Sequence, residues 1–307
     1  SSDWTRGFAA AYVMAAQAFS GIAKDLTKMS SKSAVKLIVP TAAQSSLYRW
    51  VALLTGSKNA LKGAGFFLGS ALLSKLGFAP ALISLAIALA AVLLVTVLFL
   101  SGDMGRSRSK VKFTRIFSKT PEINILSAAG FFLFGSRDVW FVVAVPVFFS
   151  ETLGWSFTQV GGFMAAWVIG YGVIQSLAPM LSRHKTAAPT GRTAQSSAFL
   201  LAAVPALIAL ALDNAIDPGP VLVGGLLVFG AVFAVNSAVH SYLILKYSDH
   251  DKVALNVGFY YMANAGGRLT GTVLSGWVFQ VWGLSGCLWV SAVLVVLAGT
   301  LSMRLPD

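Results

Sequence analysis

The chain has little of what most enzymes and secreted domains depend on. Its one cysteine, Cys287, excludes a disulfide within the chain and a thiolate metal cluster. Its three histidines, His184, His240 and His250, are too scattered in sequence to predict a metal site. The Gly-rich loop and Lys that cradle nucleotide phosphates are also missing from the sequence, so ATP hydrolysis within this chain is not expected. We therefore expect neither a bound metal nor a cofactor.

Charge is scarce as well, which favours a membrane location. Charged residues make up 11% of the 307 positions, whereas a soluble domain carries roughly 25%. Hydrophobic residues make up 56%, and the mean hydropathy is +0.76. Apolar runs of about 20 residues, the length of a membrane-spanning helix, recur along the whole sequence. The sequence predicts an all-α, polytopic helical bundle whose partner is the lipid bilayer.

The net charge of +12 is distributed between these apolar runs. Clusters of Lys and Arg in alternate connections, which lie on the same side of the membrane, are what the positive-inside rule requires. Because the basic stretches adjoin membrane-length segments, nucleic-acid binding is not expected.

Nine spans are predicted, separated by turns rich in Gly, Pro and Asp. They cover residues 8–29, 47–76, 79–101, 124–149, 157–182, 195–212, 220–246, 253–281 and 284–303.

The side of the membrane on which each connection lies follows from charge. Loop 102–123 holds six Lys or Arg residues and is predicted to be cytoplasmic. Alternation makes 183–194 cytoplasmic and 213–219 external, and it places 30–46 in the cytoplasm with Lys32 and Lys36 at the surface. The predicted domains are a three-span remainder of an N-terminal bundle (1–101), the basic linker (102–123) and a six-helix bundle (124–307). If the two halves were once equal, the chain comes from a parent of twelve spans.

A weak internal repeat supports two related halves. At a constant offset of 206 residues, Lys62 matches Arg268 and Gly77 matches Gly283. The helices that carry the first pair would be the fifth and eleventh of the parent, which are equivalent when two six-helix halves repeat in parallel orientation.

Four cationic side chains, Lys58, Lys62, Arg137 and Arg268, lie well inside predicted spans. Each costs at least about 2.5–3.5 kcal/mol at mid-bilayer, so a use is expected for them. Lys58 and Lys62 are one turn apart and share a helix face. They either snorkel to the interface or contact an anion, and a depth of roughly 17 Å for Lys58 favours the anion.

Arg137 precedes Asp138 near the centre of its span. Adjacent residues point about 100° apart on a helix, so we expect each to meet a different helix rather than the other. Arg137 is interpreted as an oxyanion ligand, because its planar fork suits phosphate or arsenate oxygens. A structural ion pair with a neighbouring helix is the alternative.

Asn256, Tyr260, Asn264 and Arg268 repeat every four residues and form one polar stripe. Lipid offers such a stripe no partner, so it is predicted to face substrate, water or polar side chains. Neighbouring glycines would also permit close packing of this helix, which is the simpler interpretation.

Charge then indicates the substrate class. Five embedded cations, with Lys24 as the fifth, against Asp25 and Asp138 leave a formal excess of three positive charges. A cavity with that balance attracts a small multivalent anion and repels cations. The predicted substrate-binding residues are Lys24, Lys58, Lys62, Arg137, Tyr260, Asn264 and Arg268. Proton coupling would use Asp25, Asp138 or His240, and exchange against another anion is equally open.

The sequence resembles a known family of transporters. The polar string Gly21–Lys36, followed by Leu-Thr-Gly-Ser-Lys-Asn-Ala-Leu-Lys-Gly at 54–63, is similar to the organoarsenical efflux permease (ArsJ) branch of the major facilitator superfamily. The resemblance covers essentially the whole chain, as spans four to twelve. It implies a bacterial inner-membrane protein that exports 1-arseno-3-phosphoglycerate, a compound made by a partner glyceraldehyde-3-phosphate dehydrogenase.

Two alternatives stay open at the level of sequence. A phosphorylated-metabolite antiporter of the same fold would need the same cations. A membrane-embedded enzyme acting on an anionic lipid would need paired acid and base groups near an interface, and the sequence shows no His-Asp or Glu pair at useful spacing. We therefore do not expect an enzyme.

Overall fold

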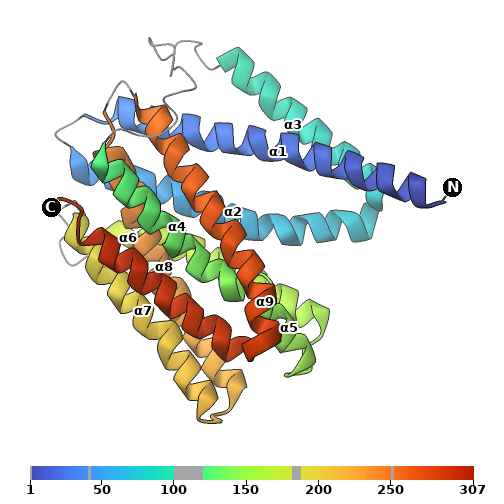
Figure 1. Cartoon of the computed structure of the whole chain (residues 1–307). Helices are drawn as coiled ribbons and strands as arrows, with labels where there is room; N and C mark the ends of the chain where they lie inside the picture. The colour runs from blue at the N-terminus through green and yellow to red at the C-terminus, as the bar shows by residue number, and fades with distance from the viewer. Residues whose placement is uncertain (1, 41–42, 100–119, 182–187, 250–251) are drawn as a thin grey trace.

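The computed structural model describes residues 2–40, 43–99, 120–181, 188–249 and 252–307, and the regular structure within these ranges is helical (Figure 1). The helices are α1 (Ser2–Ile38), α2 (Gln44–Leu76), α3 (Phe78–Phe99), α4 (Pro121–Phe141), α5 (Ala144–Glu151), α6 (Phe157–Leu181), α7 (Gly191–Asp213), α8 (Pro218–Lys246) and α9 (Val253–Ser302). The predicted all-α fold class is confirmed. The basic linker is described only from residue 120 onward, so most of it lies outside the described residues.

Long apolar helices account for most of the described chain. By length and composition, α3, α4 with α5, α6, α7, α8 and α9 can each cross a membrane. At 50 residues α9 would rise about 75 Å, far more than one crossing needs. It is divided at Gly283, whose φ of 65° and ψ of −164° are not helical, so it provides the two spans that the sequence predicts.

The two glycines related by the sequence repeat have the same structural role. Gly77 separates α2 from α3 with a φ of 78°, and Gly283 divides α9 with a φ of 65°. A positive φ is strained for residues with a Cβ, which is why glycine occupies both turns.

One predicted span is broken. The segment predicted at 124–149 forms α4 and α5, with Val142 and Val143 between them. Pro146 lacks the N–H that would bond the carbonyl four residues earlier, so the helix is interrupted there. The side-chain oxygen of Ser275 on α9 accepts a hydrogen bond from the Ala144 N–H at 3.2 Å, so this backbone group next to the break has a partner.

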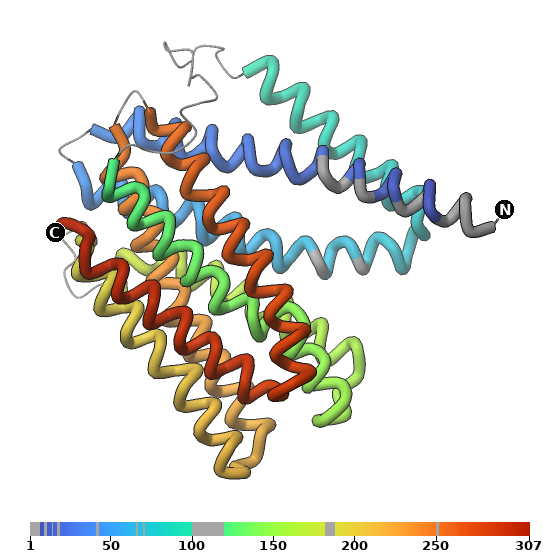
Figure 2. Tube along the Cα trace, viewed as in Figure 1, coloured from blue at the N-terminus to red at the C-terminus, as the bar shows by residue number. Residues whose placement is uncertain are grey.

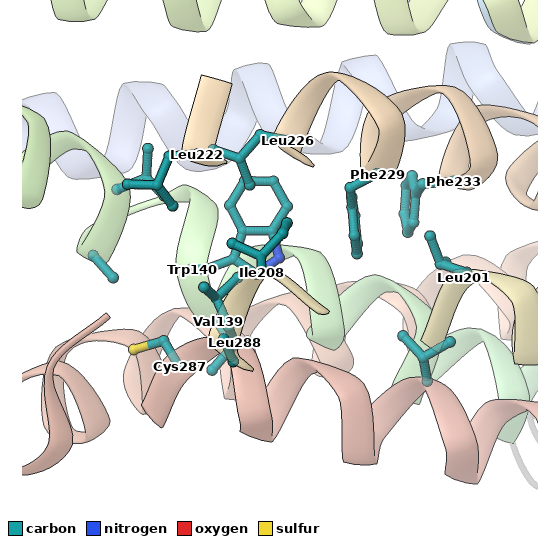
Figure 3. Close-up of a cluster of buried hydrophobic side chains, with 14 of the residues drawn as sticks. Val139, Trp140, Leu201, Ile208, Leu222, Leu226, Phe229, Phe233, Cys287 and Leu288 are labelled. Carbon is teal, nitrogen blue, oxygen red and sulfur yellow. The ribbon is translucent and has the colours of Figure 1, made fainter. Parts of the chain in front are cut away.

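Helices α4 to α9 form a bundle with an aromatic core. Trp140 packs edge-on against Trp167 and Phe229, with ring centroids 5.9 and 4.9 Å apart. The indole N–H of Trp167 donates to the Leu226 carbonyl at 2.7 Å, so the buried ring leaves no polar atom unpaired. Figure 3 shows Trp140 and Phe229 among the aliphatic side chains of this core.

Helices α1 and α2 contact the bundle at one end and extend away from it, and α3 packs against α2 (Figures 1 and 2). At that end Leu47, Tyr48 and Val51 of α2 are buried, and the Tyr48 and Tyr242 rings pack edge-on. Most described residues of α3 are exposed.

The C-terminus closes the same end of the molecule. The carbonyl of Pro306 accepts hydrogen bonds from the Gly191 N–H at 3.1 Å and from the Tyr247 hydroxyl at 2.8 Å. The start of α7, the end of α8 and the end of the chain are thereby held together.

Candidate functional site

A cavity of about 560 Å³ lies where α1 and α2 meet the bundle, and its wall comes from α1, α2, α4, α8 and α9. Seven cationic side chains line it: Lys24, Lys28, Lys32, Lys58, Lys62, Arg137 and Arg268.

Helix α1 contributes three lysines, Lys24, Lys28 and Lys32, one turn apart. Lys28 forms an ion pair with Asp25 on the same helix. The Lys32 ammonium lies 5.0 Å from the ring centroid of Tyr261 on α9, a cation–π distance.

The expected surface position of Lys32 and Lys36 is wrong. Lys32 is 3% exposed and Lys36 is 5% exposed. The reason is that α1 continues to Ile38 instead of ending near residue 29, so its last turns pack against the bundle.

Helix α2 contributes Lys58 and Lys62 from a position held tightly against α6. A Cβ on Gly56 would collide with the backbone of Gly172, so only glycine permits this approach. The Asn59 side-chain amide donates to Gln175 Oε1 at 2.6 Å, and Gln175 donates onward to Ser237 on α8 at 3.0 Å.

Helices α4 and α9 bring Arg137, Asp138 and Arg268 together. Arg137 Nε donates to Asp138 Oδ1 at 2.7 Å, and Arg268 Nε donates to Asp138 Oδ2 at 2.8 Å. The expectation that Arg137 and Asp138 do not pair is therefore wrong. The two side chains leave the helix in different directions, but the long Arg137 side chain folds back toward Asp138. The Asp138 carboxylate therefore accepts hydrogen bonds from both arginines.

The close packing of α4 on α9 makes this arrangement possible. A Cβ on Gly135 would lie 2.9 Å from the Gly267 carbonyl oxygen, and one on Gly267 or Gly271 would overlap the backbone of α4. Three glycines therefore let the two backbones touch. Arg268 directly follows one of them, which fixes its distance from Asp138.

The polar stripe of α9 faces the cavity in part. Tyr260, Asn264 and Arg268 line the cavity, and the segment from Tyr260 to Arg268 spans about 12 Å of helix rise. Asn256 is buried and lies outside the lining residues.

All seven residues predicted to bind substrate line this one cavity, and their role as ligands stays a prediction. Of the three residues predicted to couple protons, Asp25 lines the cavity and Asp138 lies behind the two arginines. His240 is fully buried and is not part of the cavity wall.

Sequence reasoning missed several lining residues. Lys28 and Lys32 continue the four-residue spacing of Lys24, but the sequence predicts Lys32 at the cytoplasmic surface and no role for Lys28. Ser237 and Ser241 are also four residues apart in an apolar helix, which is a weak sign of a polar face. Tyr261 had no sequence signal.

The charge of the site exceeds the prediction. Among the described residues, seven cations in the wall face Asp25 and Asp138, which leaves a formal excess of five positive charges. The predicted excess was three, and Lys28 and Lys32 supply the difference.

A polytopic helical bundle with a polar cavity between two groups of helices has the architecture of a secondary transporter. The family model of the Major Facilitator Superfamily matches residues 126–307, and the chain belongs to this superfamily. No curated protein matches the chain in sequence.

Two solved structures share the fold. A bacterial homologue of the iron transporter ferroportin, in an outward-facing state, is 14% identical with a TM-score of 0.70, over 91% of this chain and 68% of that one. The human organic anion transporter MFSD10 (TETRAN) is 18% identical with a TM-score of 0.70, over 89% and 67%. The superfamily and these neighbours point to a membrane transporter of small substrates rather than an enzyme.

Proposed function

We propose that the protein carries a multivalent organic anion across the membrane by alternating access. The observation that carries this proposal is the cavity wall, which holds seven cations and Asp25, with Asp138 behind two of the cations. Such a wall concentrates anions and repels cations. One structural neighbour is described as an organic anion transporter and the other as a homologue of an iron transporter, so the fold alone does not distinguish an anion from a cation as substrate. The positive charge of the cavity supports the anion.

The particular substrate that we propose is 1-arseno-3-phosphoglycerate, exported across a bacterial inner membrane. Its support is the resemblance of residues 21–36 and 54–63 to the organoarsenical permeases, together with a cavity suited to oxyanions. Lys24, Lys58, Lys62, Arg137 and Arg268 are the proposed charged ligands, with Tyr260 and Asn264 as neutral ones. A glyceraldehyde-3-phosphate dehydrogenase would supply the substrate.

A phosphorylated-metabolite antiporter is the second candidate, because the same cations suit any phosphate ester. The two candidates differ in their response to arsenate. If the protein exports the arsenical, it gives arsenate tolerance to cells that also express the dehydrogenase. If it is a phosphorylated-metabolite antiporter, it gives these cells no tolerance.

Energy coupling has one candidate directly at the cavity. Asp25 lies in its wall and pairs with Lys28, so an anion that draws Lys28 away would free a carboxylate to accept a proton. Asp138 and His240 are the other proposed carriers, and exchange against a second anion needs none of them.

The test of the transport proposal is Arg268→Ala. Arg268 combines a cavity position with a side chain that is 48% exposed, so its loss removes a contact available to substrate. We expect uptake of radiolabelled glycerol 3-phosphate into proteoliposomes to fall at least roughly tenfold, the usual scale for losing a charged hydrogen bond to an anion.

The matched control is Lys252→Ala. This variant removes one positive charge from a side chain that is 60% exposed and pairs only locally with Asp249. Equal uptake by both variants would refute the site assignment. Undiminished arsenate sensitivity in cells carrying the wild-type protein and the dehydrogenase would refute the arsenical substrate.

A further inference from the structure

Asp138 is enclosed between two arginines and reaches the cavity only through them. Its two oxygens are divided, with Oδ1 accepting from Arg137 and Oδ2 from Arg268. Asp138 is 1% exposed, whereas the Arg268 side chain is 48% exposed. A carboxylate placed in this way acts on a ligand through the arginines that it holds.

The two arginines are oriented differently. The Arg137 guanidinium lies 5.5 Å from the ring centroid of Phe233 and 5.8 Å from that of Phe141, and its side chain is only 14% exposed. Arg268 commits its Nε to Asp138 and extends into the cavity. Because a guanidinium has five N–H donors in a rigid fork, fixing Nε also fixes the direction of the remaining donors.

The charge at this end of the cavity can be counted. Lys62 on α2 interacts electrostatically with Lys24, Arg137, Arg268 and Asp138. Four cations and one carboxylate leave a formal excess of three positive charges. Without the carboxylate the excess would be four.

Resting on the proposed anion transport, we propose that Asp138 is the resident counter-ion of the arginine pair and sets the charge of the anion group that the site selects. It subtracts one positive charge from the site, and this lowers the attraction for a doubly charged oxyanion group, such as a phosphate monoester, more than the attraction for a singly charged one.

The test compares two ligands that differ by one charge. Glycerol 3-phosphate is close to doubly charged at pH 7.5, because the second pKa of a phosphate monoester is about 6. Its methyl diester carries a single charge at similar size. Affinities are measured by titration calorimetry on the purified protein in nanodiscs at low salt, where screening is weak.

Asp138→Asn is expected to bind both ligands more tightly than the wild type. The substitution removes a negative charge that repels both ligands. The repulsion removed is about twice as large for the doubly charged ligand as for the singly charged one. The ratio of monoester to diester affinity should therefore rise by roughly tenfold. If Asp138 only supports the fold, Asp138→Asn instead weakens both ligands together with thermal stability, and the proposal is overturned.

Two further variants separate charge from structure. Asp25→Asn removes the same charge from the other carboxylate of the cavity, whose ion pair is with Lys28, so it should change the ratio much less. The double variant Arg137→Gln/Asp138→Asn restores the wild-type excess of three charges and should restore the wild-type ratio. It also keeps the test usable if Asp138→Asn alone does not fold.

The outcomes distinguish the two proposals. If the wild type binds neither ligand, the proposed anion transport fails. If the wild type binds both but Asp138→Asn leaves the ratio unchanged, or matches Asp25→Asn, the counter-ion role fails while anion binding stands.

Discussion

Single lysines in α1 decide how far the cationic wall extends. Lys32 and Lys36 are one turn apart and both buried, yet only Lys32 lines the cavity. The pair therefore separates the effect of charge in the cavity from the effect of burying a lysine.

Lys32→Met should weaken anion binding while Lys36→Met leaves it unchanged. Methionine keeps most of the length of the lysine side chain and removes its charge. One charge lost from the cavity wall should lower affinity for glycerol 3-phosphate by roughly three- to thirtyfold. Titration of both variants measures this, and equal affinities would exclude Lys32 from the site.

For single residues, the sequence predicted the cations that line the cavity better than it predicted the side chains with which they pair. Lys58, Lys62, Arg137 and Arg268 were identifiable because charge inside an apolar span is costly. The pairing of one carboxylate with two arginines was not, because it depends on how closely α4 approaches α9. That distance follows from three-dimensional packing, of which the glycines are only a hint.

Among the elements, the contact between α4 and α9 has the most effect on the site. Gly267 is where the two backbones come closest, since a Cβ there would overlap the Phe131 carbonyl. Gly276, about two and a half turns further along α9, has open space around its Cβ position. The same substitution at these two positions therefore has opposite expected effects.

Gly267→Ala should destabilise the protein and weaken anion binding. Forcing the helices apart costs roughly 1–3 kcal/mol and moves Arg268 away from Asp138. Gly276→Ala should be neutral or stabilising by up to about 1 kcal/mol, because alanine is the better helix former. Thermal unfolding in detergent measures both, and a Gly267→Ala variant as stable as the wild type would show that the contact is looser than described.

Element boundaries were predictable where apolar runs end at Gly or Pro, as between α2 and α3. The break between α4 and α5 was missed because Pro146 lies within an otherwise apolar run. The extension of α1 was missed because its lysines were assigned to a loop. The structure shows instead that the last turns of α1 pack against the bundle, so a buried helix end can carry the polar pattern of a surface.

In the whole molecule, α1 and α2 meet the bundle mainly at one end, and α3 packs against α2. The connection between α2 and α6 is the most direct, through the glycine contact at Gly56 and the hydrogen bond of Asn59 to Gln175. Alternating access requires these two groups of helices to move relative to each other. This contact is therefore expected to open during transport.

A reversible link across α2 and α6 should stop transport without abolishing binding. Asn59→Cys and Gln175→Cys, made together with Cys287→Ala, give two thiols on facing helices. A short bis-methanethiosulfonate cross-linker, which forms a disulfide with each thiol and releases methanesulfinate, should block uptake, and a reductant should restore it. Each single-cysteine variant is the control, and full uptake in the linked protein would show that the contact stays closed throughout the cycle.

In the proposed alternating-access cycle, the glycine packing of α4 on α9 is expected to keep Arg137, Asp138 and Arg268 together, whereas the lysines of α1 and α2 are expected to move with the other group of helices. A bound anion would then not keep the same set of contacts when the cavity faces the two sides of the membrane. Its half-saturation concentration should differ between the two faces. The gradient still sets the direction of net flow, but the protein is tuned to a different concentration range on each side.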